Sequence, residues 1–340
     1  MTKFVVVLLA VVPCLWPATK PGAAEEANKG LALAREGKYE LAIPHYRAAI
    51  TIDKRLPGIY LNLGLAYFKL DRFSDAATAL DQAVKQDPTS FQARVLLGMS
   101  YYACRRFDAA AVELKRASDA QPDNIELRYK LAQSYLWSGQ YQGAKDEFQF
   151  LLTKQPDSGP VHMLMGEVLD AANQSADAIA EFEAAVKSAP REPEVHFGLG
   201  YLYWKQKRYD EARREFLAEL GRVPRHVQAL TYLGDSEMNL ENDMAAEESL
   251  RRALLLDTNA RLAHLDLGIV LAKNDRSPEA AQHFREAIRI DPSKPDAHYR
   301  LGRLLRAMGR EDDANAEFAK VKELASEEKQ PLVKIAGPPK

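Results

Sequence analysis

Two carboxylates occupy positions that the rest of the sequence fills, at a regular spacing, with small or apolar residues. Glu219 replaces a small residue, and Glu237 replaces a tyrosine or leucine. Paired carboxylates can act as general acid and general base when their surroundings drive their pKa values apart. Because a buried carboxylate without a partner is strongly unfavourable, we expect a register adjustment that buries Ala218 instead, with Arg222 or Arg251 neutralising a glutamate. The alternatives are catalysis and a weak joint between helices.

Four of the seven histidines share one repeating position, which raises the question of a metal site. They are His162, His196, His264 and His298. A zinc ion needs nitrogen ligands at about 2.0–2.1 Å, whereas packed helix axes are about 8–10 Å apart. Because residues one repeat apart lie on neighbouring helices, we expect packing histidines. We predict no metal site and no cofactor.

The sequence has none of the usual catalytic motifs. It contains no phosphate-binding glycine loop, no nucleophile elbow and no cysteine–histidine arrangement. Charged residues make up 28% of the chain and its net charge is −2, so nothing favours nucleic acid as a partner. We predict that the chain is not an enzyme and has no small-molecule substrate.

Alanine recurs every 34 residues through most of the chain. The nine alanines are Ala42, Ala76, Ala110, Ala144, Ala178, Ala212, Ala246, Ala280 and Ala314. Loops that carry catalytic residues would interrupt such a series, and no insertion of even one residue does so. An unbroken array of one helical unit forms an extended surface instead.

Two further positions repeat with the alanines. Twelve residues before each alanine stands a small residue: Gly30, Gly64, Gly98, Ala132, Gly166, Gly200, Gly234, Gly268 or Gly302. Four residues after it stands a large apolar one: Tyr46, Leu80, Leu114, Phe148, Phe182, Phe216, Leu250, Phe284 or Phe318. A glycine inside a helix costs about 1 kcal/mol relative to alanine, so we expect close helix approaches there, with the large residue filling the space beside them.

Prolines near the ends of six units predict where second helices end, because proline cannot continue a helix. They are Pro88, Pro122, Pro156, Pro190, Pro224 and Pro292. Alignment on the alanines predicts nine units of two helices each: 23–56, 57–90, 91–124, 125–158, 159–192, 193–226, 227–260, 261–294 and 295–328.

This combination of spacing, small positions, large position and closing proline resembles the tetratricopeptide repeat (TPR) family over residues 23–328. The resemblance implies an all-α, right-handed superhelical solenoid of nine tandem helix-turn-helix units, whose first helices line a concave groove for peptides or helices. It also implies that the helices of Glu219 and Glu237 are neighbours, and that the histidine position packs against the preceding unit. Family members that clamp a terminal carboxylate place asparagine after the glycine position. This chain has none there, so we expect no such clamp.

Aromatic residues are numerous on the first helices, at positions expected to face the groove. They are Phe68, Tyr102, Tyr129, Trp137, Phe197, Tyr201, Trp204 and Tyr299. Phe197, Tyr201 and Trp204 stand at i, i+4 and i+7, which places them on one stripe of a helix. Aromatic side chains of this kind are common energetic anchors of interfaces. We predict contacts with a partner, the alternative being that they serve packing alone.

Arginines form a second predicted binding feature in the last unit. Arg300, Arg303, Arg306 and Arg310 share one broad helix face, and arginine binds carboxylates through bidentate contacts. We expect Arg303 and Arg306 to hold an acidic segment or a terminal carboxylate. The alternative is a solvated face on the capping unit.

The N-terminus predicts export. Lys3 precedes an apolar run from Phe4 to Trp16, and Gly22-Ala23-Ala24 offers a cleavage site, so we expect a signal peptide over residues 1–24 and a helix from Glu25. The alternatives are an uncleaved anchor or a lipid on Cys14, the only ways in which we expect membrane contact. Residues 329–340 are expected to be a disordered tail that could dock on a neighbour.

The prediction is an exported adaptor, periplasmic or secreted, that binds a peptide segment or helix of a partner protein in the concave groove. The alternative is a constitutive structural component of a cell-envelope assembly, such as a secretion or pilus machine.

Overall fold

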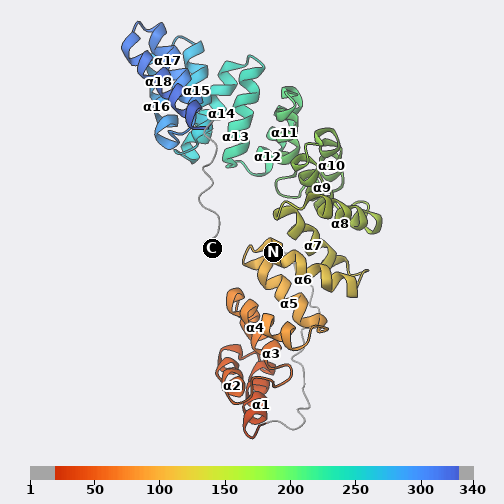
Figure 1. Ribbon diagram of the computed structural model, residues 1–340. Helices are drawn as coiled ribbons and strands as arrows, with labels where there is room; N and C mark the ends of the chain where they lie inside the picture. The colour runs from red at the N-terminus through yellow and green to blue at the C-terminus, as the bar shows by residue number, and fades with distance from the viewer. Residues whose placement is uncertain (1–19, 329–340) are drawn as a thin grey trace. The chain divides into compact units, whose positions relative to one another are not determined.

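The computed structural model describes residues 20–328, and within them all regular secondary structure is helical (Figure 1). The predicted signal segment as far as position 19, Cys14 and the 329–340 tail lie outside these residues. The helices are α1 Ala23–Arg35, α2 Tyr39–Ile52, α3 Ile59–Lys69, α4 Phe73–Gln86, α5 Phe91–Ala103, α6 Phe107–Ala120, α7 Ile125–Trp137, α8 Tyr141–Lys154, α9 Gly159–Ala171, α10 Ser175–Ser188, α11 Val195–Lys205, α12 Tyr209–Arg222, α13 Val227–Asn239, α14 Asp243–Leu256, α15 Arg261–Lys273, α16 Ser277–Ile290, α17 Pro295–Ala307 and α18 Glu311–Glu328. Over the described range, none of them combines the length and apolar character needed to cross a bilayer.

Each predicted unit is one pair of these helices, so the prediction of an all-α array of nine helix pairs is confirmed for residues 20–328. The nine repeating alanines lie on the second helix of each pair, and every one of them is 0% exposed. A larger side chain has no room there, which explains why this position stays small in every unit.

The repeating glycines lie where the two helices of a pair meet. A Cβ atom placed on Gly234 would lie 2.5 Å from Leu250 Cγ and 3.3 Å from the carbonyl oxygen of Ala246. The first distance is shorter than real Cβ contacts and the second is tight, so a side chain at Gly234 would force Leu250 to shift, which explains the preference for glycine at this position. The expectation of close approach is confirmed, and the large residue four positions after the alanine is the nearest neighbour.

The turn inside each pair has one fixed conformation. In all nine pairs the fifteenth residue of the unit has a positive φ, between 56° and 76°. These residues are Gly37, Asp71, Arg105, Gly139, Asn173, Lys207, Glu241, Asp275 and Gly309. Only three are glycine, so six turns place a side chain in the left-handed region that favours glycine.

The nine repeat units group into two larger compact units, with the boundary between Ser188 and Ala189. We call these larger groups the N-terminal unit and the C-terminal unit. Helices α1–α10 form the N-terminal unit, and α11–α18 form the C-terminal unit. In each unit, successive first helices contact one another, as α3 does with α5 and α13 with α15, whereas successive second helices make no comparable contact. The first helices therefore lie on the inner side of each unit, where the sequence places the predicted groove residues.

Candidate protein-binding surfaces

Four aromatic side chains gather on the first-helix face of the C-terminal unit. Phe197, Tyr201 and Trp204 lie along α11, and Tyr232 lies on α13. Ring centroids are 5.7 Å apart for Tyr201 and Trp204, and 4.8 Å apart for Trp204 and Tyr232. All four side chains are partly exposed. We call them the C-terminal aromatic cluster.

Core packing and hydrogen bonds fix the cluster in place. Tyr232 stacks on the fully buried Phe216 at a centroid distance of 6.1 Å. At the other side, Trp204 Nε1 donates to Asp235 Oδ2 over 3.0 Å, and Asn239 donates to Asp235 Oδ1 over 2.7 Å. The indole is therefore held in one orientation before any partner arrives.

Acidic groups border this cluster. Burial raises the pKa of Asp235, although the hydrogen bonds from Trp204 and Asn239 partly oppose the rise. Burial, and then the charge of Asp235, raises the pKa of Asp266 on α15 well above its usual range. Both shifts have the same main cause, because burial disfavours the charged form of a carboxylate.

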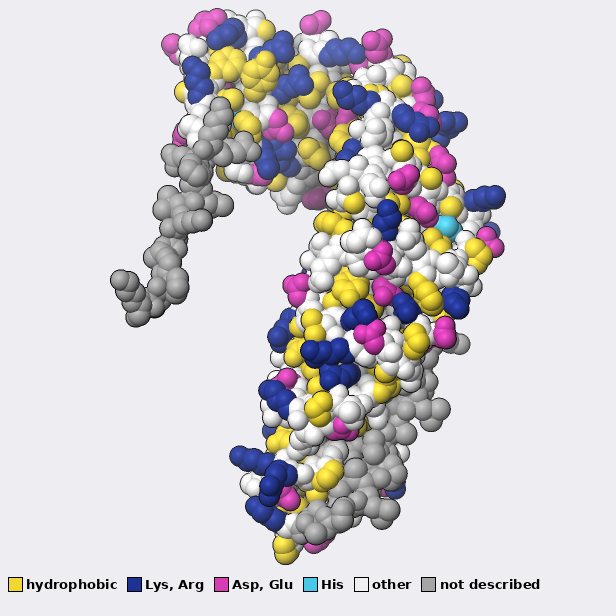
Figure 2. Space-filling view, turned by 45° about the vertical axis from the view of Figure 1, so that its right-hand side comes forward, with side chains coloured by type: hydrophobic (Ala, Val, Ile, Leu, Met, Phe, Trp, Pro, Cys, Tyr) yellow, Lys and Arg dark blue, Asp and Glu magenta, His cyan; other side chains and the backbone are white. Residues whose placement is uncertain are grey.

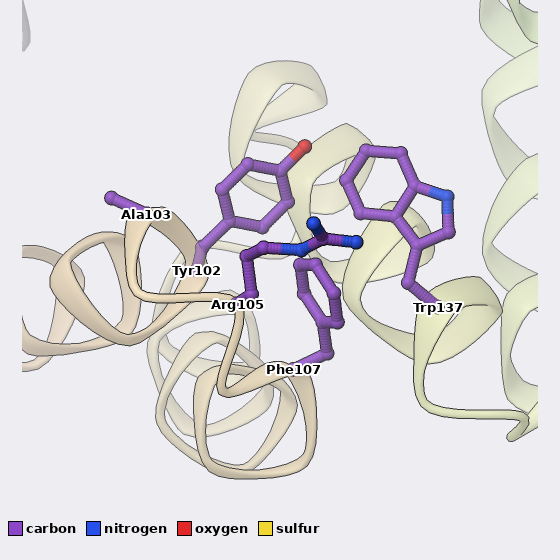
Figure 3. Close-up of a pocket in the computed structure, with 5 residues that line it drawn as sticks. All are labelled: Tyr102, Ala103, Arg105, Phe107 and Trp137. Atoms are coloured by element: carbon purple, nitrogen blue, oxygen red, sulfur yellow. The ribbon is translucent and has the colours of Figure 1, made fainter.

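A second aromatic group lies in the N-terminal unit. Tyr102 at the end of α5, Phe107 at the start of α6 and Trp137 at the end of α7 have ring centroids 5.1–5.8 Å apart. They line a hollow of about 490 Å³ together with Ala103 and Arg105, and Figure 3 shows the side chains of Tyr102, Arg105, Phe107 and Trp137 turned toward one another. The Trp137 side chain is 45% exposed.

Polar contacts hold Tyr102 much as Trp204 is held. The Tyr102 hydroxyl donates to Gln133 Oε1 over 2.8 Å, and Lys130 Nζ donates to the same oxygen over 2.9 Å. Lys130 Nζ also lies 4.6 Å from the Tyr102 ring centroid. Burial lowers the pKa of Lys130 to about 8, since removing water disfavours its charged form.

Of the other predicted binding residues, Tyr129 adjoins the second group, because Lys130 Nζ lies 4.6 Å from the Tyr102 ring centroid and 5.8 Å from that of Tyr129. Phe68 packs edge-on against Phe73, and Tyr129 packs edge-on against the buried Phe148. In the last pair, the guanidinium of Arg303 lies 6.0 Å from the Tyr299 ring centroid. Arg306 lies 4.7 Å from the Phe318 ring centroid, with its Nε 3.6 Å from a Glu311 oxygen. Partner contact by these residues stays a prediction. Figure 2 shows charges of both signs interspersed on the face in view.

Sequence reasoning missed Tyr232, Phe107 and Arg105. Phe107 carries a signal that could have found it, because aromatic residues recur at its position in the first four units. They are Tyr39, Phe73, Phe107 and Tyr141. No comparable sequence signal marks Tyr232, because the equivalent position in the repeat units that follow is not aromatic.

The prediction made from the sequence for the surroundings of Glu219 and Glu237 is wrong. Glu219, not Ala218, takes the buried position: it is 0% exposed, and neither carboxylate oxygen has a hydrogen-bond partner. Arg222 donates instead to the carbonyl oxygen of Glu192. A carboxylate thus replaces the usual small residue without compensation.

Glu237 has partners other than those expected. Its Oε2 accepts a hydrogen bond of 2.8 Å from Asn242 and lies 3.9 Å from a guanidinium nitrogen of Arg213. Arg251 instead pairs with Glu247. Asn242 is the partner because it stands in the turn directly after the helix that carries Glu237, within hydrogen-bond distance of the carboxylate.

The repeating histidines make polar bridges. In seven pairs the fourth residue of the unit contacts the residue nineteen positions later, at 2.5–2.9 Å. The pairs are Glu26–His45, Arg94–Glu113, Arg128–Glu147, His162–Glu181, His196–Glu215, His264–His283 and His298–Glu317. His162 also reaches the carbonyl oxygen of Pro156 in the preceding unit. Residues 20–328 contain no group of three or more side chains suited to a metal ion.

Repeated helix pairs with an aromatic first-helix face define the class of helical repeat proteins. Models of the tetratricopeptide repeat match residues 61–125, 163–227 and 231–295, and also 101–168 and 271–330, and a model of the TPR repeat matches residues 30–71. The chain therefore belongs to the tetratricopeptide repeat family. Proteins of this family act as protein-interaction scaffolds, typically without enzymatic activity. No curated protein sequence matches the chain.

Solved structures share the fold. The APC/C hetero-tetramer Cut9-Hcn1 is 16% identical, with a TM-score of 0.55, over 82% of this chain and 54% of that one. A tetratricopeptide repeat protein of Parabacteroides merdae is 15% identical, with a TM-score of 0.55, over 72% and 97%. PilF of Pseudomonas aeruginosa is 21% identical, with a TM-score of 0.53, over 61% and 94%.

Proposed function

We propose that this protein is an adaptor that binds an extended or helical segment of another protein on the first-helix face of its C-terminal unit. The observation that carries the proposal is the C-terminal aromatic cluster. Phe197 and Tyr232 rest on the core residue Phe216, yet all four residues of the cluster remain partly exposed. Rigid aromatic side chains of this kind supply large contact areas at little cost in conformational entropy.

The hydrogen bond from Trp204 to Asp235 adds preorganisation. Because the indole is already oriented, binding loses less side-chain freedom than it would on a mobile tryptophan. A single short segment held by such anchors would bind with a dissociation constant of about 1 μM, or about −8 kcal/mol. Contact along several first helices would strengthen binding further.

The proposal places the protein outside the cytoplasm, in the periplasm or secreted. The support is the sequence of Lys3, the apolar run from Phe4 to Trp16 and the small residues that follow. Helix α1 begins at Ala23, which is 0% exposed, two residues before the expected start at Glu25. Cleavage after Ala24 would therefore remove the first two residues of α1.

Affinity capture tests the proposal. The full chain serves as bait in an envelope extract of the source cells, beside a Tyr201→Ala/Trp204→Ala variant. The matched control is Leu255→Ala, which removes an 83% exposed side chain from the second helix α14 of the same unit. Circular dichroism verifies that all three chains have equal helicity.

We expect a partner that the parent and the control retain and the double variant loses. If all three baits retain the same proteins at a fixed ratio, the aromatic cluster does not bind the partner. That result would favour the alternative, a constitutive component of a cell-envelope assembly.

A further inference from the structure

Two adjoining hollows open at the turn between α5 and α6, beside the last turn of α7, and Figure 3 shows the residues that line the first. The first is lined by Tyr102, Ala103, Arg105, Phe107 and Trp137, and it encloses about 490 Å³. The second encloses about 400 Å³ and shares Arg105, Phe107 and Trp137 with the first. Because these three lining residues are shared, the two hollows adjoin, and we call them together the trough; the lining of the first is mainly aromatic and that of the second is more polar.

Neither Arg105 nor Arg106 in this turn forms an ion pair with a described residue. In four other turns the arginine at the position of Arg106 pairs with a carboxylate three residues later: Arg72–Asp75, Arg208–Glu211, Arg276–Glu279 and Arg310–Asp313. Here that later residue is Ala109, and Arg106 instead stacks on the Tyr101 ring at 4.5 Å. Among the described residues, Arg105 has neither an ion pair nor a hydrogen-bond partner for its side chain.

The acid that lines the trough does not neutralise Arg105. Asp108 lies in the second hollow, and its Oδ1 accepts a hydrogen bond of 3.3 Å from Gln140. The trough therefore combines a free guanidinium with the 45% exposed indole of Trp137. A guanidinium binds carboxylates, and the aromatic rings accept a large apolar side chain.

We infer that the trough docks an extended segment of a partner protein in which a glutamate or aspartate directly follows a large apolar residue. The inference rests on the proposed function of binding protein segments and adds a second contact surface with its own specificity. The apolar side chain packs in the first hollow against the exposed Trp137 side chain, and the carboxylate accepts hydrogen bonds from Arg105. Because the trough continues past Arg105, a chain can pass through it and no chain end is required.

Fluorine NMR of the full chain labelled with 5-fluorotryptophan tests this site. The chain has three tryptophans, and a Trp137→Phe variant assigns the Trp137 signal. The probes are two capped hexapeptides, acetyl-Gly-Ser-Phe-Glu-Ser-Gly-amide and the same peptide with Gln in place of Glu. Capping removes both terminal charges, so only the side chain differs.

We expect the Glu peptide to shift the Trp137 signal saturably, with an affinity about fivefold higher than that of the Gln peptide. Arg105→Gln should abolish this difference without changing the affinity for the Gln peptide. The matched control is Lys207→Gln, which removes a cation from the same turn position in another repeat, at a φ of 60°. It should leave both affinities unchanged.

Equal affinities for the two peptides, or no shift of the Trp137 signal, would overturn the inference. So would tighter binding of acetyl-Gly-Ser-Phe with a free terminal carboxylate, which would show that the trough takes chain ends. If these probes fail while the capture experiment succeeds, only the trough assignment is wrong. If the parent chain captures no partner, the proposed function itself fails.

Discussion

Trp204 Nε1 donates a hydrogen bond to Asp235 Oδ2 over 3.0 Å, and the two residues are 31 positions apart in the chain. Tyr102 and Gln133 are linked at the same separation, over 2.8 Å. In both cases an aromatic donor in the last turn of one first helix meets an acceptor on the next first helix. The repeat geometry thus orients one aromatic side chain on the first-helix face of the N-terminal unit and one on that of the C-terminal unit.

The first prediction concerns the energy of this bond. Asp235→Ala leaves the Trp204 Nε1 group without its acceptor, so we expect the free energy of unfolding to fall by about 1 kcal/mol. A Trp204→Phe variant removes the donor. Urea unfolding of both single variants and the double variant gives the coupling energy between the two side chains. Strictly additive effects would show that the bond contributes nothing.

The second prediction concerns glycines in the C-terminal unit. A Cβ atom on Gly200 would lie 2.8 Å from Phe216 Cε1, whereas one on Gly221 would have no neighbour within 4 Å. Gly200→Ala should lower the free energy of unfolding by about 1–3 kcal/mol through overpacking. Gly221→Ala should raise it by about 0.5–1 kcal/mol through helix propensity. Thermal unfolding of the two variants checks the opposite signs, and equal signs would refute this account of the spacing.

The third prediction concerns Glu219 and Glu237, two of the buried glutamates. Glu219→Ala removes a fully buried carboxylate whose oxygens have no partner, and it restores the residue most common at that position. We expect stabilisation by about 1–3 kcal/mol. Glu237→Ala is the control, because it breaks the contact with Asn242 and should destabilise the fold. Destabilisation by both substitutions, measured by urea unfolding, would mean that Glu219 has a favourable role.

The repeat could be predicted from the sequence because each conserved spacing reflects a steric limit. Nine fully buried alanines and eight crowded glycines leave few other residues possible. The boundary after Ser188 could not be predicted, because Ala178 and Ala212 keep the usual spacing across it. The spacing of the alanines reflects only the number of residues in each helix pair. The boundary after Ser188 depends on how neighbouring helix pairs pack, which this spacing does not reveal.

The aromatic surfaces could be predicted only in part. Phe197, Tyr201 and Trp204 share one helix, so their spacing alone places them on one stripe. Tyr232 joins them from the next first helix, and nothing in the sequence of α11 indicates it. Contacts between helices also bring Trp137 of α7 against Tyr102 and Phe107.

The fourth prediction concerns pH. His264 Nδ1 lies 2.9 Å from His283 Nδ1, where four other pairs join histidine to glutamate. Burial, followed by the charges of His264 and Arg251, lowers the pKa of His283, and Glu279 and Glu286 oppose this only weakly. Since the unfolded chain then binds more protons, stability is lost as the pH falls below about 6.5.

His283→Glu converts this contact into the histidine–glutamate pair of the other repeats. Compared with the parent, it should retain more stability between pH 7.5 and pH 5.5, by about 1 kcal/mol. His283→Gln removes the titrating imidazole without adding a negative charge. It therefore distinguishes the effect of losing that titration from the effect of giving His264 a charged partner. Urea midpoints at the two pH values give the comparison, and identical pH dependence in all three chains would contradict the prediction.

The most direct measurement of the central claim is the dissociation constant of a captured partner segment for the parent chain and for Trp204→Ala, by isothermal titration calorimetry. The account predicts at least about a tenfold loss of affinity, since aromatic anchors contribute roughly 2 kcal/mol or more. Leu255→Ala should bind as the parent does. Unchanged affinity in Trp204→Ala would contradict binding on the C-terminal aromatic cluster.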